Sequence, residues 1–126
     1  MIAVGTTVVR ALETVTDRRG VASPGEGWTT LVIGHDRPLR AVNGMITGFH
    51  EPHATHLAMI EQVIVAAGGN LSSSHLDRAY REAQDERYLW HEFGDSHLII
   101  GGSRPEEGVD ISPQTVNCVT RARRLA

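Results

Sequence analysis

The chain's first group of residues suited to chemistry is Gly5-Thr6-Thr7. It follows the apolar run Ile2–Val4 and precedes apolar residues at helical spacing, with Arg10 one turn later. The amino terminus of a helix offers free N–H groups and a positive dipole end, so this pattern predicts a site for an anionic group. Arg10 would add a bidentate donor to the same ligand. Alternatively, one of the two threonines caps the helix and Arg10 is solvated.

Histidines dominate the second group, residues 49–56, where His50, His53 and His56 recur every three residues beside a glutamate. This composition raises the hypothesis of a metal-dependent hydrolase. The spacing argues against it, because His50 precedes Pro52 and only the other two would share a helix, at i, i+3. A neutral imidazole at the end of a strand is suited to general base catalysis, and His50 is therefore the candidate. The alternative is that His50 has a structural role and only makes hydrogen bonds.

Carboxylates form the third group. Acidic and basic side chains alternate over residues 82–87, which include Glu86, and this pattern is typical of a solvated helix face. Asp95 follows Gly94 at a predicted turn from helix to strand, where a carboxylate can either cap the backbone or face a site. The aromatic residues nearby are more consistent with packing than with a base-stacking platform.

Composition limits the classes of protein to which the chain can belong. Its 126 residues, 40% of them hydrophobic, fit one domain with a modest core. All twelve cationic residues are Arg, yet the net charge is −3, which argues against a complete nucleic-acid-binding protein. The single Cys118 cannot form an internal disulfide or a thiolate metal site. No apolar run or signal-peptide pattern indicates a membrane, so a cytoplasmic protein is predicted.

Strands and helices alternate along the chain, which predicts an α/β fold with a mixed sheet and flanking helices. A strand at the very start needs sheet partners, and this favours a missing amino-terminal half. Helices are predicted from Thr6 to before residues 18–20, from Pro52 to Gly68-Gly69, from a Ser74/Asp77 capping box along a stripe to Trp90, and over 113–124. Strands are predicted at Ile2–Val4, at Trp28–Ile33 paired in a hairpin with Leu39–Val42, at Met45–Phe49 and at His97–Ile100, with a loop at Gly20–Gly27.

Three motifs in register resemble those of one family, the S-adenosylmethionine:tRNA ribosyltransferase-isomerases of queuosine biosynthesis. The family pattern runs Val-Gly-Thr-Thr-Ser-Val-Arg, then Thr-Asn-Phe-His-Leu-Pro-x-Ser-Thr, then Ala-Tyr and Glu-x-Tyr-Arg-Phe-Phe-x-Tyr-Gly-Asp-Ala-Met. The matching residues here are Val4 to Thr7 with Arg10 and Glu13, then Asn43-Gly44, Thr47, Phe49-His50, Pro52 and Thr55, then Ala79-Tyr80, Ala83, Glu86, Tyr88 and Gly94-Asp95.

The resemblance implies that residues 1–101 are the carboxy-terminal part of a larger catalytic domain, a partial three-layer α/β sandwich, and that 102–126 form a polar tail. It implies S-adenosylmethionine as the ribosyl donor, 7-aminomethyl-7-deazaguanine in tRNA as the acceptor, epoxyqueuosine as the product, and no metal. The tRNA would be bound by the full-length enzyme, and the missing amino-terminal part or a second copy of the chain would complete the sheet.

The resemblance also implies roles for individual residues. His50 is expected to transfer the proton, while Glu86 and Asp95 orient ligands. Substrate binding is expected from Gly5, Thr6, Thr7, Arg10, Phe49 and Thr55.

Several residues depart from the family pattern. Gly48 stands where the family has Asn, Leu89 to Phe93 replace the Arg-Phe-Phe-x-Tyr stretch, and His97 replaces Met. Val8, Glu51 and Ala54 are further departures. A non-catalytic or divergent fragment that binds a nucleotide-like ligand or a partner chain is therefore the second hypothesis, and the metal-dependent hydrolase of His50, His53 and His56 is the third.

Overall fold

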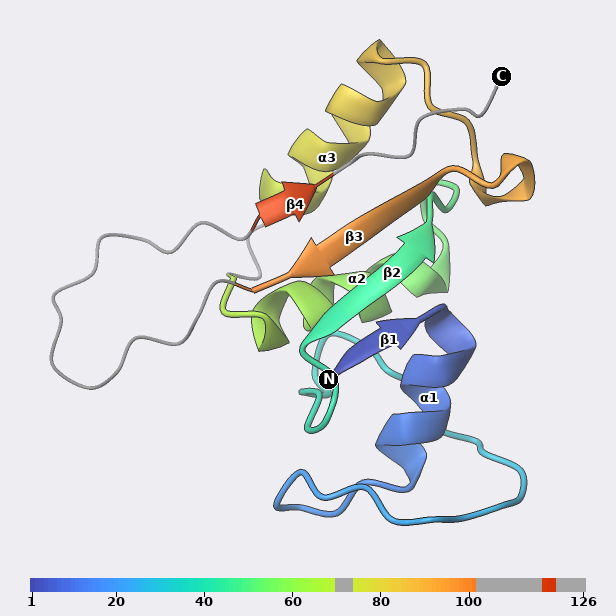
Figure 1. Ribbon diagram of the computed structural model, residues 1–126, viewed down its shortest axis with the longest axis vertical. Helices are drawn as coiled ribbons and strands as arrows, with labels where there is room; N and C mark the ends of the chain where they lie inside the picture. The colour runs from blue at the N-terminus through green and yellow to red at the C-terminus, as the bar shows by residue number, and fades with distance from the viewer. Residues whose placement is uncertain (70–73, 102–116, 120–126) are drawn as a thin grey trace, which may run out of the picture.

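The computed structural model describes residues 1–69, 74–101 and 117–119 (Figure 1). In this part of the chain, three α-helices and one 3₁₀ helix accompany a four-stranded sheet. The elements in chain order are β1 (Ile2–Val4), α1 (Thr6–Thr14), β2 (Gly44–Gly48), α2 (Thr55–Ala66), α3 (Ser74–Asp85), η1 (His91–Phe93), β3 (Ser96–Ile100) and β4 (Asn117–Val119).

The sheet is mixed, as the sequence predicts, and its strand order is β1-β2-β3-β4. β1 and β2 run parallel, with Val4 opposite Ile46, while β2 and β3 run antiparallel, with Gly48 opposite Ser96. β4 adds to β3 in the antiparallel sense. The parallel pair is joined through α1 and a long loop, as a parallel connection requires.

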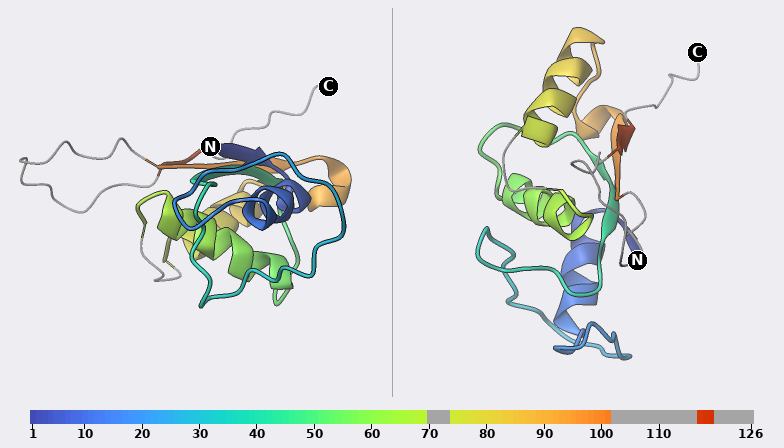
Figure 2. Two further views of the ribbon diagram at one scale, coloured as in Figure 1. Left: turned by 90° about the horizontal axis from the view of Figure 1, so that it is seen from below. Right: turned by 90° about the vertical axis from the view of Figure 1, so that its left-hand side faces the viewer.

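All three α-helices lie on one face of the sheet (Figure 2). Side chains that point toward the helices are buried, among them Ala3, Met45 and Ile99, and they form the core with Ile60 and Val63 of α2. The prediction of a mixed sheet with flanking helices is confirmed. The layering of a three-layer sandwich is not observed, because within the described residues helices cover a single face.

The other face of the sheet is apolar and open. Ile2, Val4 and Ile46 are 56%, 64% and 38% exposed, and they alternate along their strands with the buried residues. Leu98 and Ile100, which lie opposite Ile46 and Gly44, extend the same face. Contiguous apolar surface of this kind is typical of interaction sites.

The predicted hairpin of Trp28–Ile33 and Leu39–Val42 is wrong, because neither segment is a strand. Side chains of α1 satisfy part of the loop backbone instead. The carboxylate of Glu13, 2% exposed, accepts hydrogen bonds from the backbone N–H groups of Arg40, Ala41 and Val42, at N–O distances of 2.9 to 3.2 Å. A backbone that is bonded in this way does not need a partner strand.

Several predicted helix boundaries also need correction. α2 begins at Thr55 and not at Pro52, and α3 ends at Asp85, so Trp90 lies outside it. The predicted end of α2 is confirmed, since Gly68 has a left-handed φ of 95°. Of the predicted helix 113–124, residues 117–119 form a strand, and the rest lies outside the described residues, as does most of the predicted tail 102–126.

Candidate active site at the carboxyl edge of the parallel strands

The three motifs meet at one edge of the sheet. β1 and β2 are parallel, so Gly5 after β1 and His50 after β2 leave the sheet at the same end. β3 is antiparallel to β2, so Asp95 enters the sheet at that end as well. A backbone hydrogen bond of 2.8 Å from Gly5 N to Ile46 O fixes the first motif beside the second. Ligand sites of α/β proteins commonly lie at this edge.

Three imidazoles gather at this edge, and we call His50, His56 and His91 the histidine stack. The ring centroids of His50 and His56 are 4.8 Å apart with an angle of 21° between the ring planes, and His91 lies 5.3 Å from His50. Two contacts fix His50 further. Its Nε2 lies 3.0 Å from Thr47 Oγ1, and its backbone N–H donates to the Tyr80 hydroxyl at 3.0 Å.

The local backbone explains why these histidines and not others meet. His53 has a left-handed φ of 67°, and its ring is not in the stack. Gly48 has no Cβ, and a Cβ there would lie 2.3 Å from the His91 Cβ, so glycine is what allows η1 to pack against β2. His91 N also donates to Phe49 O at 3.0 Å.

The surroundings of His50 favour its neutral form. Partial burial lowers the pKa of His50 below its ordinary value, Coulombic interaction with the His56 and His91 imidazoles lowers it further, and Glu92 opposes them. A neutral imidazole at pH 7 can accept a proton, so the electrostatics suit a general base.

His97 lies behind this edge, in the core. It is 1% exposed and stacks on Phe49 with 5.3 Å between ring centroids. Neither ring nitrogen has a hydrogen-bond partner among the described residues. Burial, followed by the charge of His50, lowers the pKa of His97 to about 4. Phe49 itself is buried between this ring and the rings of Tyr80 and Tyr88, so its side chain is part of the core, and the substrate contact expected of it stays a prediction.

The amino terminus of α1 is open. Gly5, with φ 87°, is its N-cap, and among the described residues no side chain caps the helix, so the alternative that Thr6 or Thr7 caps it is wrong. Arg10 is not simply solvated either. Its Nε donates to Leu31 O at 3.0 Å and one Nη donates to Thr29 O at 3.4 Å, which ties the 29–31 loop to α1.

The remaining candidates are spread around the site. Asp95 caps the backbone, since its Oδ2 accepts from Leu89 N at 2.6 Å and holds the segment that leads to η1. Glu86 follows the last residue of α3 and Thr55 opens α2, both with exposed side chains. The ligand contacts expected of these three residues stay predictions.

Sequence reasoning missed several members of the site. Thr47, the Tyr80 hydroxyl and His91 all contact His50. Thr47 lies in the same motif as His50, whereas Tyr80 and His91 come from the third motif, and sequence reasoning gave none of the three a role. The available signal for His91 was its place in the third motif. Over residues 1–69, 74–101 and 117–119, no group of three His, Cys, Asp or Glu side chains is arranged to hold a metal ion.

Comparison with known proteins decides the family. The model of a family described as queuosine biosynthesis protein matches residues 1–99. The chain belongs to this family. Among curated relatives, the S-adenosylmethionine:tRNA ribosyltransferase-isomerase of Symbiobacterium thermophilum is 44% identical over 100 residues, and that of Aquifex aeolicus is 40% identical over 100 residues.

The chain spans only about a quarter of these family members. The match covers 79% of this chain but 27% of the Symbiobacterium protein and 26% of the Aquifex protein. A crystal structure of S-adenosylmethionine tRNA ribosyltransferase from Thermotoga maritima superposes with a TM-score of 0.58 at 34% identity, covering 77% of this chain and 32% of that one. The fold described above is therefore a part of the family fold.

Two departures from the family pattern touch each other in this chain. Gly48 replaces Asn and His91 replaces the second Phe, and His91 occupies the space that a side chain at position 48 would need. The two differences together place a third imidazole beside His50. Along the described ranges, no helix has both the length and the apolar character needed to cross a bilayer.

Proposed function

We propose that this chain is the carboxy-terminal part of an S-adenosylmethionine:tRNA ribosyltransferase-isomerase and supplies the proton-transfer edge of its active site. The names of the relatives support the reaction. The observation that carries the proposal is the meeting of the Gly5, His50 and Asp95 motifs at one edge of the sheet, around a histidine held in its neutral form. S-adenosylmethionine is the ribosyl donor, and 7-aminomethyl-7-deazaguanine in tRNA is the acceptor that becomes epoxyqueuosine.

The chemistry requires a base because the sulfonium of S-adenosylmethionine acidifies the carbon bonded to it. His50 takes this proton on a ring nitrogen, while Thr47 fixes the ring through its hydroxyl at 3.0 Å. The open amide groups at the start of α1, at Thr6 and Thr7, bind the methionine carboxylate or a phosphate. Arg10 lies one turn away and supports this anion site through the loop that it holds. Asp95 acts indirectly, because its carboxylate holds the backbone before η1.

The open apolar face supports the larger assembly. Ile2, Val4 and Ile46 form a surface that the remaining part of the family chain covers, which would complete a three-layer domain. In the chain alone, a second copy covers this face. The remainder of the enzyme supplies most of the tRNA contact, consistent with the net charge of −3, and the protein acts in the cytoplasm.

The proposal is tested by His50→Ala in the full-length protein. Transfer of the ribosyl unit to tRNA that carries the deazaguanine base is measured by mass spectrometry of the digested tRNA. We expect a loss of about 10²-fold or more in kcat, the lower range for a general base. His53→Ala is the matched control and keeps its rate, because its ring lies outside the stack. Unchanged transfer by His50→Ala contradicts the assignment.

A second function is favoured by the limited span of the chain, which is 27% of a relative's length. The chain by itself would then bind a nucleotide-like ligand without turning it over. Binding of S-adenosylmethionine by the chain, with turnover only after the rest of the protein is added, distinguishes this function from catalysis by the chain alone.

A further inference from the structure

A groove lies between the start of α2 and α3, and it is lined by Tyr80, whose hydroxyl accepts the backbone N–H of His50. Its cavity volume is about 380 Å³, within the range of small-molecule sites. The lining residues are Leu57 on α2 and Leu76, Asp77, Tyr80, Arg81 and Gln84 on α3, with Pro52 at one end. The groove is formed entirely by described residues of this chain.

The lining has one apolar side and one polar side. Asp77, Tyr80, Arg81 and Gln84 follow each other at i, i+3, i+4 and i+7, so they share one face of α3. Leu57 and Leu76 provide the apolar surface. A ligand that fits this division has flat apolar faces and a polar edge, as a heteroaromatic ring does.

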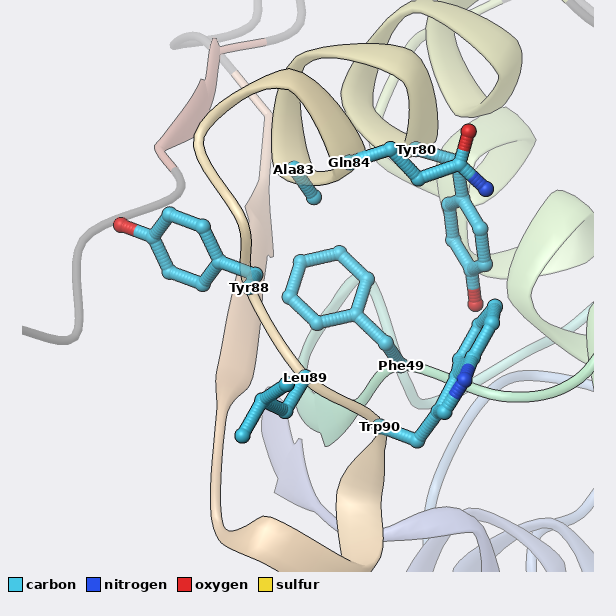
Figure 3. Close-up of a pocket in the computed structure, with 7 residues that line it drawn as sticks. All are labelled: Phe49, Tyr80, Ala83, Gln84, Tyr88, Leu89 and Trp90. Atoms are coloured by element: carbon cyan, nitrogen blue, oxygen red, sulfur yellow. The ribbon is translucent and has the colours of Figure 1, made fainter.

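The one aromatic residue of the groove, Tyr80, favours the same kind of ligand. Tyr80 and Gln84 also line a smaller pocket, whose other residues include Phe49, Tyr88 and Trp90 (Figure 3). Figure 3 shows the Tyr80 ring beside the Trp90 indole, with its hydroxyl toward that side chain and the Gln84 amide above. Of these aromatic residues only Tyr80 lines the groove itself, and an aromatic face can stack on the ring of a base.

The polar groups match the edge of a purine. The Gln84 amide carries a donor and an acceptor side by side, which pairs with the amino group and the ring nitrogen of adenine. The Asp77 carboxylate is an acceptor that suits the donor groups of a guanine-type ring. The groove also reaches the reacting residue, because the Tyr80 hydroxyl accepts the backbone N–H of His50 at 3.0 Å.

We propose that the groove between α2 and α3 binds a purine-type base of the substrate, with its ring along Tyr80 and its polar edge on Gln84 or Asp77. The inference rests on the proposed function, because it takes the base from S-adenosylmethionine or from the deazaguanine nucleotide. The proposal assigns binding of the base to α3 and proton transfer to the histidine stack.

Calorimetric titration of the chain with adenosine and, separately, with 7-aminomethyl-7-deazaguanine tests the proposal. Gln84→Leu removes the amide from an exposed position, and Gln84→Glu keeps its size but removes its donor. Asp77→Asn tests the second edge. Glu82→Gln on the same helix, outside the groove, is the control, and thermal unfolding of each variant verifies its fold.

Two results support the proposal and name the source of the base. Adenosine binding that is at least tenfold weaker in both Gln84 variants, and unchanged in Glu82→Gln, identifies the adenine of the donor. Deazaguanine binding that is at least tenfold weaker in Asp77→Asn identifies the tRNA base.

Binding of neither compound by the wild-type chain overturns the proposal, as does binding that no groove variant weakens. Ribosyl transfer that depends on His50 would remain in that case, so the two proposals fail separately.

Discussion

Thr47 Oγ1 and His50 Nε2 lie 3.0 Å apart, joining a buried strand residue to the candidate base. Thr47→Val keeps the shape of the side chain and removes the hydroxyl that orients the ring. We expect kcat of the full-length protein to fall about tenfold, equivalent to about 1.4 kcal/mol, the scale of one hydrogen bond, with KM little changed. Steady-state kinetics measure the effect, and Thr30→Val in the exposed loop is the control. A change confined to KM contradicts an orienting role.

The histidine stack predicts an unusual titration of His50. Its lowered pKa places the NMR titration of its ring below the ordinary 6.5. His56→Gln removes one of the positive charges that lower this pKa, so the midpoint rises, and the acid limb of the activity profile moves to higher pH with it. His53→Gln, outside the stack, leaves the midpoint unchanged. A His50 midpoint at or above 6.5 in the wild-type chain refutes this electrostatic picture.

The sequence predicts the elements that local pattern determines. Apolar runs locate β1, β2 and β3, and the glycines after the helical stripes mark where helices end, as at Gly68. The segment from Trp28 to Ile33 has the composition of a strand, yet Trp28 is fully exposed and the backbone bonds to Arg10. Hydrogen bonds from α1, which is distant in the sequence, hold this segment as a loop, and the local sequence pattern does not predict such contacts.

The candidate site was predictable to a similar extent. His50 and the Gly5 turn follow from their places at the ends of strands. The partners of His50 do not follow from the sequence. His91 can approach His50 because Gly48, 43 residues earlier in the chain, has no Cβ. The sequence grouped His53 with His50 and His56, but among the described residues it is His56 and His91 whose rings lie against His50, and His53 has a left-handed φ of 67°.

His97 makes the stability of the chain depend on pH. Its pKa is about 4 in the folded protein, against 6.5 for the unperturbed group. The free energy of unfolding is therefore highest above pH 6.5 and decreases as the pH falls toward 4, because the unfolded chain binds the proton more readily than the folded one. The loss is about 3 kcal/mol across that window, at about 1.4 kcal/mol for each pH unit. Denaturant unfolding of wild type and His97→Met from pH 7 to 4 measures the difference.

His97→Met also removes two buried nitrogens without partners among the described residues. We expect this variant to be about 1–3 kcal/mol more stable than wild type at pH 7, since each such group costs desolvation free energy. His53→Gln, at an exposed position, is the control. Stability curves for wild type and His97→Met that stay parallel over the whole pH range would show that His97 does not carry the dependence.

The open apolar face predicts self-association of the chain. Val4 and Ile46 are neighbours on this face, 64% and 38% exposed. Val4→Lys places a charge there, so we expect the apparent mass from light scattering to fall toward that of a monomer, 13.7 kDa. Val21→Lys changes another exposed apolar residue, 54% exposed and outside the sheet, and leaves association unchanged. A wild-type chain that is monomeric at all concentrations contradicts a contact between copies through this face.

Glu13 links α1 to the loop that leads into β2. Glu13→Gln leaves one acceptor oxygen and turns an amide donor toward the backbone N–H groups of Arg40, Ala41 and Val42. The free energy of unfolding should fall by about 2–4 kcal/mol, because hydrogen bonds to a buried charged group are lost and donors then face each other. Denaturant unfolding measures this loss, and hydrogen exchange should accelerate at Ala41 and Val42. The exposed Glu26→Gln is the control, and equal stability of the two variants would mean that the loop does not depend on Glu13.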